Sequence, residues 1–369
     1  MGTEKINGLQ FFIMILLFEL GSAVVLGFTY EAGGSSWIVI LLSMLAGIVL
    51  YLLFTHLANY HPTLTLTEAG LKIAGPIIGR VIAFLYIGYF FYIAARVLGD
   101  FSNLIQMTIL RLTPLIVVAG VFTFMVVIAS YLGIEVIART AETFFPWVIF
   151  FSALFLLFVY IDGLPDFRNL QPILDEGWEP ILTTVFPQGM TFPFGELIVF
   201  MMFFPYLAAP DKKTSIGIAG VIVSGLMLTL TQVTILAVHG AEAAKLLTIP
   251  LLETISLVNI QDIIQRMDPL IIITMIILGF FKIAIFFHAA ILGMHKTFHI
   301  PRSKRIWLVS GTGVLLLVTT YLISHNYVSH VDIGLNIVPL YVHVPLQFIL
   351  PSLLIGVAFI RYKMLKTSK

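Results

Sequence analysis

Five ionisable side chains lie inside segments of the chain that are otherwise apolar. They are Glu19, Arg96, Asp100, Glu196 and Lys282. Charged groups are unfavourable in a bilayer, so they face the interior of a helix bundle or a water-filled cavity and pair with one another. A set of this kind can bind a small charged molecule or carry a coupled proton or ion. We expect the five to form a charge network in which Glu19 and Glu196 are the counter-ions of Arg96 and Lys282. The sequence leaves open which acid pairs with which base.

A stretch rich in proline and glycine surrounds one of these acids. From Pro187 to Glu196 the chain reads Pro-Gln-Gly-Met-Thr-Phe-Pro-Phe-Gly-Glu. Proline removes a backbone donor and glycine adopts dihedrals that other residues avoid, so we expect unwound backbone over 188–194 and helix again over about 195–207. Unwound backbone survives at membrane depth only where protein buries it or water reaches it. The stretch therefore predicts a cavity beside a broken helix.

The first apolar segment has a similar interruption, Gly21-Ser22-Ala23, with Glu19 just before it. Small residues of this kind also form close packing faces between membrane helices, and that interpretation stays open. If the chain is an inverted repeat, however, this segment corresponds to the one that contains Glu196. Paired interruptions in corresponding halves indicate a transporter-type binding site. The predicted lining residues from the two breaks are Gly21, Ser22, Ala23, Phe194, Gly195 and Glu196.

Two further segments add side chains to the predicted site. Tyr92, Arg96 and Asp100 follow one another at four-residue steps, so they lie along one stripe of a helix. Arg96 and Asp100 can neutralise each other as a local ion pair, and they can face the cavity. The two interpretations can hold together. Lys282 and Phe286 are also four residues apart, in the segment that an inverted repeat would pair with this one.

The elements that position these residues are membrane-spanning helices. The 369 residues are 59% hydrophobic and 11% charged, with a mean hydropathy of +1.05, whereas a soluble domain is roughly 25% charged. A span needs about 20 apolar residues. We predict an all-α integral membrane protein with about ten such spans, at 8–30, 36–56, 81–106, 114–133, 144–161, 181–208, 214–238, 269–294, 306–325 and 338–360.

The ten spans predict one membrane domain, 1–369, built from a five-plus-five inverted repeat. Repeat one would cover about 8–161 and repeat two about 181–360, with helices 1 and 6 broken. Fourteen of the 20 Lys and Arg residues fall on segments that are cytoplasmic if the N-terminus is inside, and four fall on outer segments. This bias places both termini in the cytoplasm. The first segment lacks a cleavage-site pattern, so we expect it to be retained.

Other function classes lack the residues that they require. The chain has no cysteine and no His, Asp and Glu at metal-ligand spacing, so we expect neither a metal nor a cofactor. It shows no nucleophile–base pair and no phosphate loop, and we predict that it is not an enzyme. The net charge of +1 gives no indication of nucleic acid as a partner.

Several ordered motifs resemble one known family. They are His61-Pro-Thr-Leu-Thr-Leu-Thr-Glu68, Ala138-Arg-Thr-Ala-Glu-Thr-Phe-Phe-Pro146, Leu164-Pro-Asp-Phe167, Phe192-Pro-Phe-Gly-Glu196 and Phe204-Pro-Tyr206. They are similar to motifs of the spore germination permeases, the B subunits of nutrient germinant receptors. That family belongs to the amino acid–polyamine–organocation transporter superfamily, so the resemblance implies the LeuT-like fold.

The resemblance also implies a function, partners and a location. The chain would bind a small nutrient such as an amino acid at the broken-helix site, and would act with an A subunit and a lipoprotein C subunit in the spore inner membrane. One departure is that superfamily transporters often have two closely spaced glycines in the first break, where this chain has Gly21-Ser22-Ala23. The alternative is a proton- or sodium-coupled amino acid symporter in which Glu19, Asp100 or Glu196 carries the proton. An ion or water conduit is a third, weaker possibility.

Overall fold

The computed structural model describes residues 4–27, 29–262, 264–265 and 267–367, with no side chain described at 264, 362 or 364–367. The remaining residues of the predicted domain 1–369 lie outside this description. The helices of the first half are α1 (Gly8–Ala23), η1 (Tyr30–Ser35), α2 (Ser36–Asn59), α3 (Leu66–Ala74), α4 (Pro76–Thr108), α5 (Leu115–Leu132), α6 (Ile134–Ile161) and η2 (Phe167–Leu170), where η marks a short 3₁₀ or π segment.

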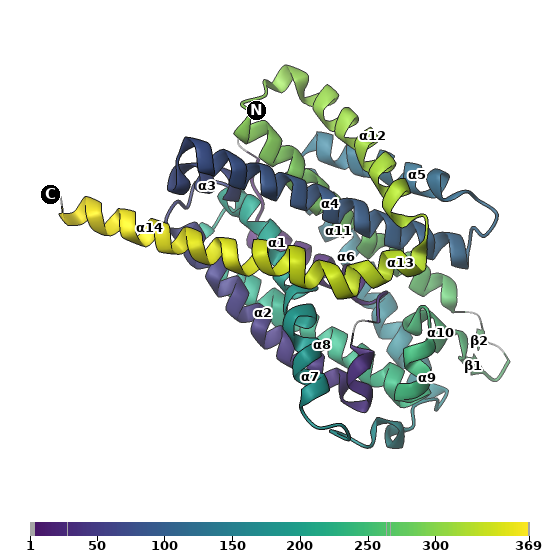
Figure 1. The fold of residues 1–369 in the computed structure, drawn as a ribbon. Helices are drawn as coiled ribbons and strands as arrows, with labels where there is room; N and C mark the ends of the chain where they lie inside the picture. The colour runs from purple at the N-terminus through teal and green to yellow at the C-terminus, as the bar shows by residue number, and fades with distance from the viewer. Residues whose placement is uncertain (1–3, 28, 263, 266, 368–369) are drawn as a thin grey trace.

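The second half begins with a helix in pieces. Its elements are α7 (Glu179–Thr184), η3 (Val185–Gly189), η4 (Phe194–Met202), η5 (Phe204–Tyr206), η6 (Pro210–Lys212), α8 (Lys213–His239), α9 (Ala241–Leu246), α10 (Pro250–Ser256), β1 (Asn259–Ile260), β2 (Ile264–Gln265), α11 (Asp268–Thr297), η7 (Arg302–Lys304), α12 (Arg305–Ser324), α13 (Tyr327–Asp332), η8 (Ile333–Ile337), η9 (Pro339–Ile349) and α14 (Leu350–Thr367). The two strands pair antiparallel and form a small hairpin (Figure 1).

Across the described ranges, nine helical stretches are long and apolar enough to cross a membrane, and the 16-residue α1 is a shorter apolar helix. These ten elements correspond to the ten predicted spans. The first prediction, 8–30, was too long, because α1 ends at Ala23 and Tyr30–Ser35 already leads into α2. The helix is interrupted at Gly21, whose backbone dihedrals (φ −23°, ψ −108°) are not helical. Glycine adopts such dihedrals readily because it has no Cβ.

The second break begins earlier than the sequence indicated, and it also includes part of the predicted range. Phe186 (φ −119°, ψ 126°) is non-helical, two residues before the predicted 188–194, and Phe192 and Pro193 form a turn within that range. Phe186 precedes Pro187, and the proline ring forces the preceding residue out of the α region. After Pro193 the chain is helical again, as expected over about 195–207, and it takes the 3₁₀ form in η4, Phe194–Met202, and in η5, Phe204–Tyr206.

The two broken elements lie at the centre of the bundle. From Phe11 to Ala23, all residues of α1 except Phe12 are buried, and so are all nine residues of η4. Long stretches of α4 and α11 are buried beside them, while α5, α6 and α12 expose large apolar side chains. Such exposed apolar side chains are expected for helices that face lipid.

The two broken elements are also joined at one end. The residues before α1 run parallel to the residues after η5: the Ile6 N–H donates to the Tyr206 carbonyl at 2.9 Å, and the Ala208 N–H donates to the Ile6 carbonyl at 2.8 Å. Ile6 is fully buried. We call this pairing the N-terminal bridge. It ties the start of the first broken helix to the end of the second.

Candidate functional site

A buried ion pair joins the second broken helix to α11. The Nζ of Lys282 lies 2.6 Å from Oε2 of Glu196, and both side chains are almost completely shielded from solvent. Glu196 stands in the first turn of η4, just beyond the break, and Lys282 stands midway along α11. The structure therefore brings together two of the five charges that the sequence singled out, and it answers which acid Lys282 contacts.

The first broken helix surrounds the same lysine. A Cβ placed on Gly21 would lie 2.6 Å from Cδ of Lys282, so the stem of the lysine fills the space that the glycine leaves. The Nζ lies 5.0 Å from the centroid of the Phe18 ring and 4.9 Å from that of the Phe192 ring. Both distances are within cation–π range. Groups from both breaks thus surround one ammonium group.

Glu19 is placed differently from the expectation. Its side chain is fully buried, and neither carboxylate oxygen has a hydrogen-bond partner in the part of the chain that the structure describes. Lys282 attracts this carboxylate electrostatically and Glu196 repels it, but Lys282 makes its contact with Glu196. Glu19 is therefore a neighbour of the pair rather than the direct counter-ion that the sequence suggested.

Arg96 and Asp100 do not form the local ion pair that their spacing allowed, as far as the described residues show. Arg96 instead donates to the hydroxyl of Tyr92 at 3.4 Å and to the backbone carbonyl of His330. The Oδ1 of Asp100 lies 2.9 Å from Nε2 of His330. Both nitrogens of this histidine face acceptors, because Nδ1 lies 3.0 Å from the carbonyl of Ile323. His330 was missed because it lies outside the predicted spans, in the short helix α13.

A cavity lies between these groups, with about 390 Å³ of space between its atoms when the solvent at its open side is included. Its charged lining residues are Arg96 and Asp100 of α4 and Glu196 of η4. Ser22 lines it from the first break, and its Oγ is buried without a hydrogen-bond partner among the described residues. The cavity thus receives residues from both breaks and from the α4 stripe. Its other lining residues are Leu26, Ile93, Val97, Phe192, Val331, Gly334, Leu335, Val338 and His343.

The other predicted site residues lie around this cavity rather than on its lining. Phe194 packs against α2 where Gly47 has no side chain, and the centroid of the Phe286 ring lies 5.0 Å from that of Phe18, with the rings tilted by 53°. Gly195 allows the amide of Gln347 to approach, since a Cβ there would lie 2.1 Å from its Oε1. Gly21 accommodates Lys282, Tyr92 holds Arg96, and Ala23 lines a neighbouring cavity. The ligand-binding roles of all these residues stay predictions.

Sequence reasoning also missed a polar cluster behind Glu196. The hydroxyl of Tyr89 lies 2.7 Å from Nδ1 of His343 and accepts a hydrogen bond from Nε2 of Gln347 at 2.8 Å. The Nε2 of His343 lies 3.9 Å from Oε1 of Glu196. A signal was present, because His343 and Gln347 are polar residues four positions apart in an apolar span.

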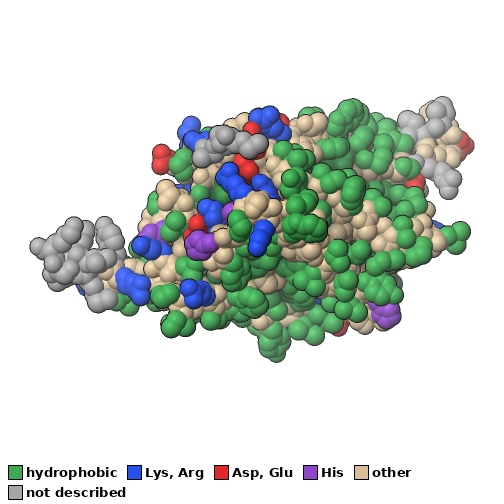
Figure 2. Space-filling view, turned by 90° about the horizontal axis from the view of Figure 1, so that it is seen from above, with side chains coloured by type: hydrophobic (Ala, Val, Ile, Leu, Met, Phe, Trp, Pro, Cys, Tyr) green, Lys and Arg blue, Asp and Glu red, His purple; other side chains and the backbone are tan. Residues whose placement is uncertain are grey.

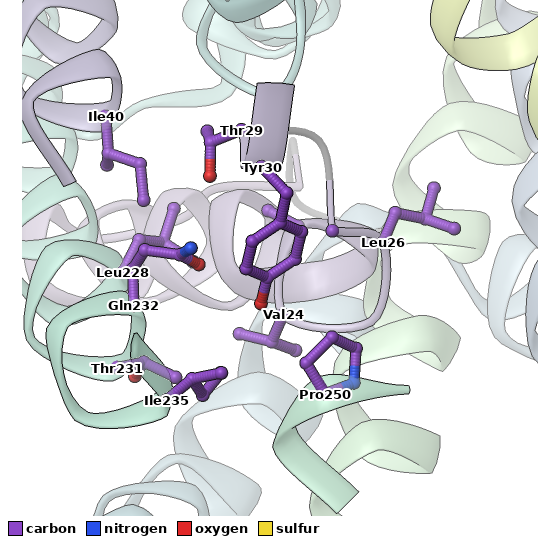
Figure 3. Close-up of a pocket in the computed structure, with 12 residues that line it drawn as sticks. Val24, Leu26, Thr29, Tyr30, Ile40, Leu228, Thr231, Gln232, Ile235 and Pro250 are labelled. Carbon is purple, nitrogen blue, oxygen red and sulfur yellow. The ribbon is translucent and has the colours of Figure 1, made fainter. Parts of the chain in front are cut away.

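A second cavity adjoins the first and carries no charged residue on its lining. It has about 360 Å³ of empty space between the end of α1, α8 and the start of α10, and Figure 3 shows Tyr30 and Gln232 extending into it. Leu26 lines both cavities. The Nε2 of Gln232 is buried without a hydrogen-bond partner among the described residues. This cavity suits a neutral polar group or water, whereas the first suits a charged one.

Comparison with solved structures identifies the fold. The chain is similar to MhsT in complex with L-phenylalanine (TM-score 0.61, 12% identity, 97% of this chain and 88% of that chain). It is also similar to a Na⁺-coupled sialic acid symporter (TM-score 0.67, 10% identity, 94% and 78%) and to Mhp1, a nucleobase-cation-symport-1 family transporter (TM-score 0.67, 13% identity, 96% and 78%). The fold is the LeuT-like transporter fold, as the sequence predicted.

Sequence comparison identifies the family. A family model described as spore germination protein matches residues 5–328. The chain is 34% identical to spore germination protein KB of Bacillus subtilis (strain 168) over 369 residues, covering 100% of this chain and 98% of that protein. It is 25% identical to spore germination protein YndE of the same organism, covering 80% and 82%. The resemblance found in the sequence motifs is confirmed: the chain is an integral membrane protein that belongs to the spore germination protein family of permease-like proteins.

Proposed function

We propose that the chain is the nutrient-sensing membrane subunit of a spore germination receptor, and that a small zwitterion such as an amino acid binds in the charged cavity. The observation that carries this proposal is the lining of the cavity, where Arg96 stands with Asp100 and Glu196 and all three are buried. A guanidinium matches a ligand carboxylate, and the acids match a ligand ammonium. Low dielectric strengthens both interactions.

Binding would act on partner subunits through the two breaks. Ser22 and Glu196 line the cavity from different broken helices, so a ligand between them biases how those helices sit relative to each other. By the family resemblance, the A subunit and the lipoprotein C subunit in the spore inner membrane would respond to this change in helix position. Cytoplasmic termini are part of the proposal. Figure 2 supports them, because Lys and Arg gather at one end of the molecule and apolar side chains cover much of the rest.

A symporter is the second candidate, because Glu19 is a fully buried carboxyl group without a hydrogen-bond partner in the described chain. Such a group takes up a proton readily if water reaches it in another state of the transport cycle. The neighbouring folds include a Na⁺-coupled symporter and a cation symporter. The receptor is preferred because the family match covers most of the chain.

One experiment tests both candidates. The chain is reconstituted in liposomes, and binding and uptake of a labelled amino acid mixture are measured with and without a proton gradient. A receptor binds without accumulating, whereas gradient-driven accumulation that Glu19→Gln abolishes identifies a symporter. Arg96→Gln should weaken binding about 10-fold or more through loss of a charge-assisted hydrogen bond. The matched control is Arg139→Gln, an exposed arginine of α6. Equal binding by both variants would contradict the proposed site.

A further inference from the structure

The ammonium of Lys282 occupies the point where both broken helices meet α11. Its Nζ lies 2.6 Å from the Glu196 carboxylate and about equally far from the rings of Phe18 and Phe192, at 5.0 and 4.9 Å. We infer that this point is a monovalent-cation site that the chain fills permanently with its own lysine. The inference concerns the same site as the proposed function, and its consequence for nutrient binding rests on that function.

The surroundings of the ammonium are those of a cation site rather than of a simple ion pair. An ion pair needs only a carboxylate, but here two aromatic faces from different broken segments complete the shell around the charge. The aliphatic stem of Lys282 has room as well, because Gly21 has no side chain at the place that Cδ of the lysine occupies. The carboxylate and the Phe192 ring come from the second broken segment, and the Phe18 ring and the space beside Gly21 come from α1.

A second carboxyl group, that of Glu19, lies near the ion pair. Glu19 and Glu196 are two acids beside one lysine, and Lys282 contacts only Glu196. The ammonium of Lys282 already supplies a positive charge where the two broken helices meet α11, so no Na⁺ or K⁺ is needed there. We therefore expect the fold and the nutrient site to be independent of inorganic monovalent cations at this position.

Truncating the lysine should convert the filled site into an open one. In Lys282→Ala the atoms Cγ, Cδ, Cε and Nζ are missing, which are the atoms of propylammonium. The variant would leave the Glu196 carboxylate buried without its cation, so its melting temperature should fall by roughly 5 °C or more. Propylammonium should enter the space and restore most of this loss, because it returns both the charge and the volume.

The experiment measures thermal melting of the purified full chain in detergent. Lys282→Ala is titrated with propylammonium chloride against N-methylglucamine chloride at constant ionic strength. We expect a saturable upward shift with propylammonium for Lys282→Ala and none for the wild type. The matched control is Lys213→Ala, because Lys213 is also buried but donates to Asn59 outside any such cage. Propylammonium should not restore that variant. Equal shifts in all three chains, or none in Lys282→Ala, would overturn the inference.

Two further measurements keep the inference open to refutation if the variant folds poorly. Lys282→Ala purified with propylammonium present should give folded protein in higher yield, and failure with and without the amine counts against the inference. The wild type should melt at one temperature in Na⁺, K⁺ and N-methylglucamine, so saturable stabilisation by Na⁺ or K⁺ would contradict it. None of these readouts involves a nutrient. A failure of the cation site is therefore distinguishable from a failure of the proposed nutrient binding.

Discussion

At the scale of single residues, the site depends on the pairing of buried charges. Glu196 and Lys282 stabilise each other at 2.6 Å in the interior of the bundle. Burying either charge alone is strongly unfavourable, whereas a close pair compensates much of the desolvation. This asymmetry explains why both residues are needed, although the pair as a whole adds little net stability over well-packed apolar side chains.

Glu196→Gln should destabilise the protein by about 3–5 kcal/mol, because it leaves the ammonium of Lys282 buried without a carboxylate. Adding Lys282→Met should restore much of that loss, since the double variant has no buried charge at this position. Thermal or denaturant melting in detergent measures both effects. The matched control is Glu135→Gln, which breaks an exposed pair with Arg139 and should change stability by less than about 1 kcal/mol. A double variant no more stable than Glu196→Gln would contradict this account.

At the scale of elements, the second break positions Glu196, and its glycine permits close packing. A Cβ on Gly195 would lie 2.1 Å from Oε1 of Gln347 and 3.0 Å from the backbone carbonyl of Met190. The carbonyl belongs to the turn that precedes η4, so the collision cannot be relieved by a rotamer change alone. Gly195 therefore holds η4 against η9.

Gly195→Ala should cost about 1–3 kcal/mol, the usual range for overpacking in a tight core. Gly88→Ala is the matched control, because Gly88 lies within α4 and a Cβ there meets nothing within 4 Å. Alanine favours helix over glycine, so the control should be neutral or stabilising. The melting temperatures of the two variants test this prediction. Equal losses of stability in both variants would show that the contact between Gly195 and Gln347 is not tight.

Elements were easier to predict from the sequence than contacts. The number of spans and both interruptions followed from hydropathy and from glycine and proline, whose effects are local. The exact residue of the second break was also open to local reasoning, because Phe186 precedes a proline. By contrast, nothing local indicates that Asp100 meets His330, more than two hundred residues away, rather than Arg96, four residues away. Such partners are set by packing of the whole bundle.

At the scale of the whole molecule, the N-terminal bridge makes one unit of the two broken helices. The Ile6 N–H donates to the carbonyl of Tyr206, the last residue of η5, and Ile6 lies just before α1. Ile6→Pro removes this donor and should destabilise the protein by about 1–3 kcal/mol more than Ile6→Ala, which also loses side-chain packing but keeps the N–H. Melting in detergent measures the difference, and equal losses would contradict a role for the bridge.

The bridge has a further consequence for how a signal leaves the site. The bridge fastens the start of α1 to the residues at the end of η5, whereas the Lys282–Glu196 pair fastens η4 to α11 beside Gly21 of α1. A ligand that moves the two broken helices apart at the cavity therefore also shifts their linked ends. The displacement reaches the N-terminal bridge, where the buried Ile6 meets Tyr206, so a neighbouring subunit that contacts this end of the bundle would respond to binding at the cavity.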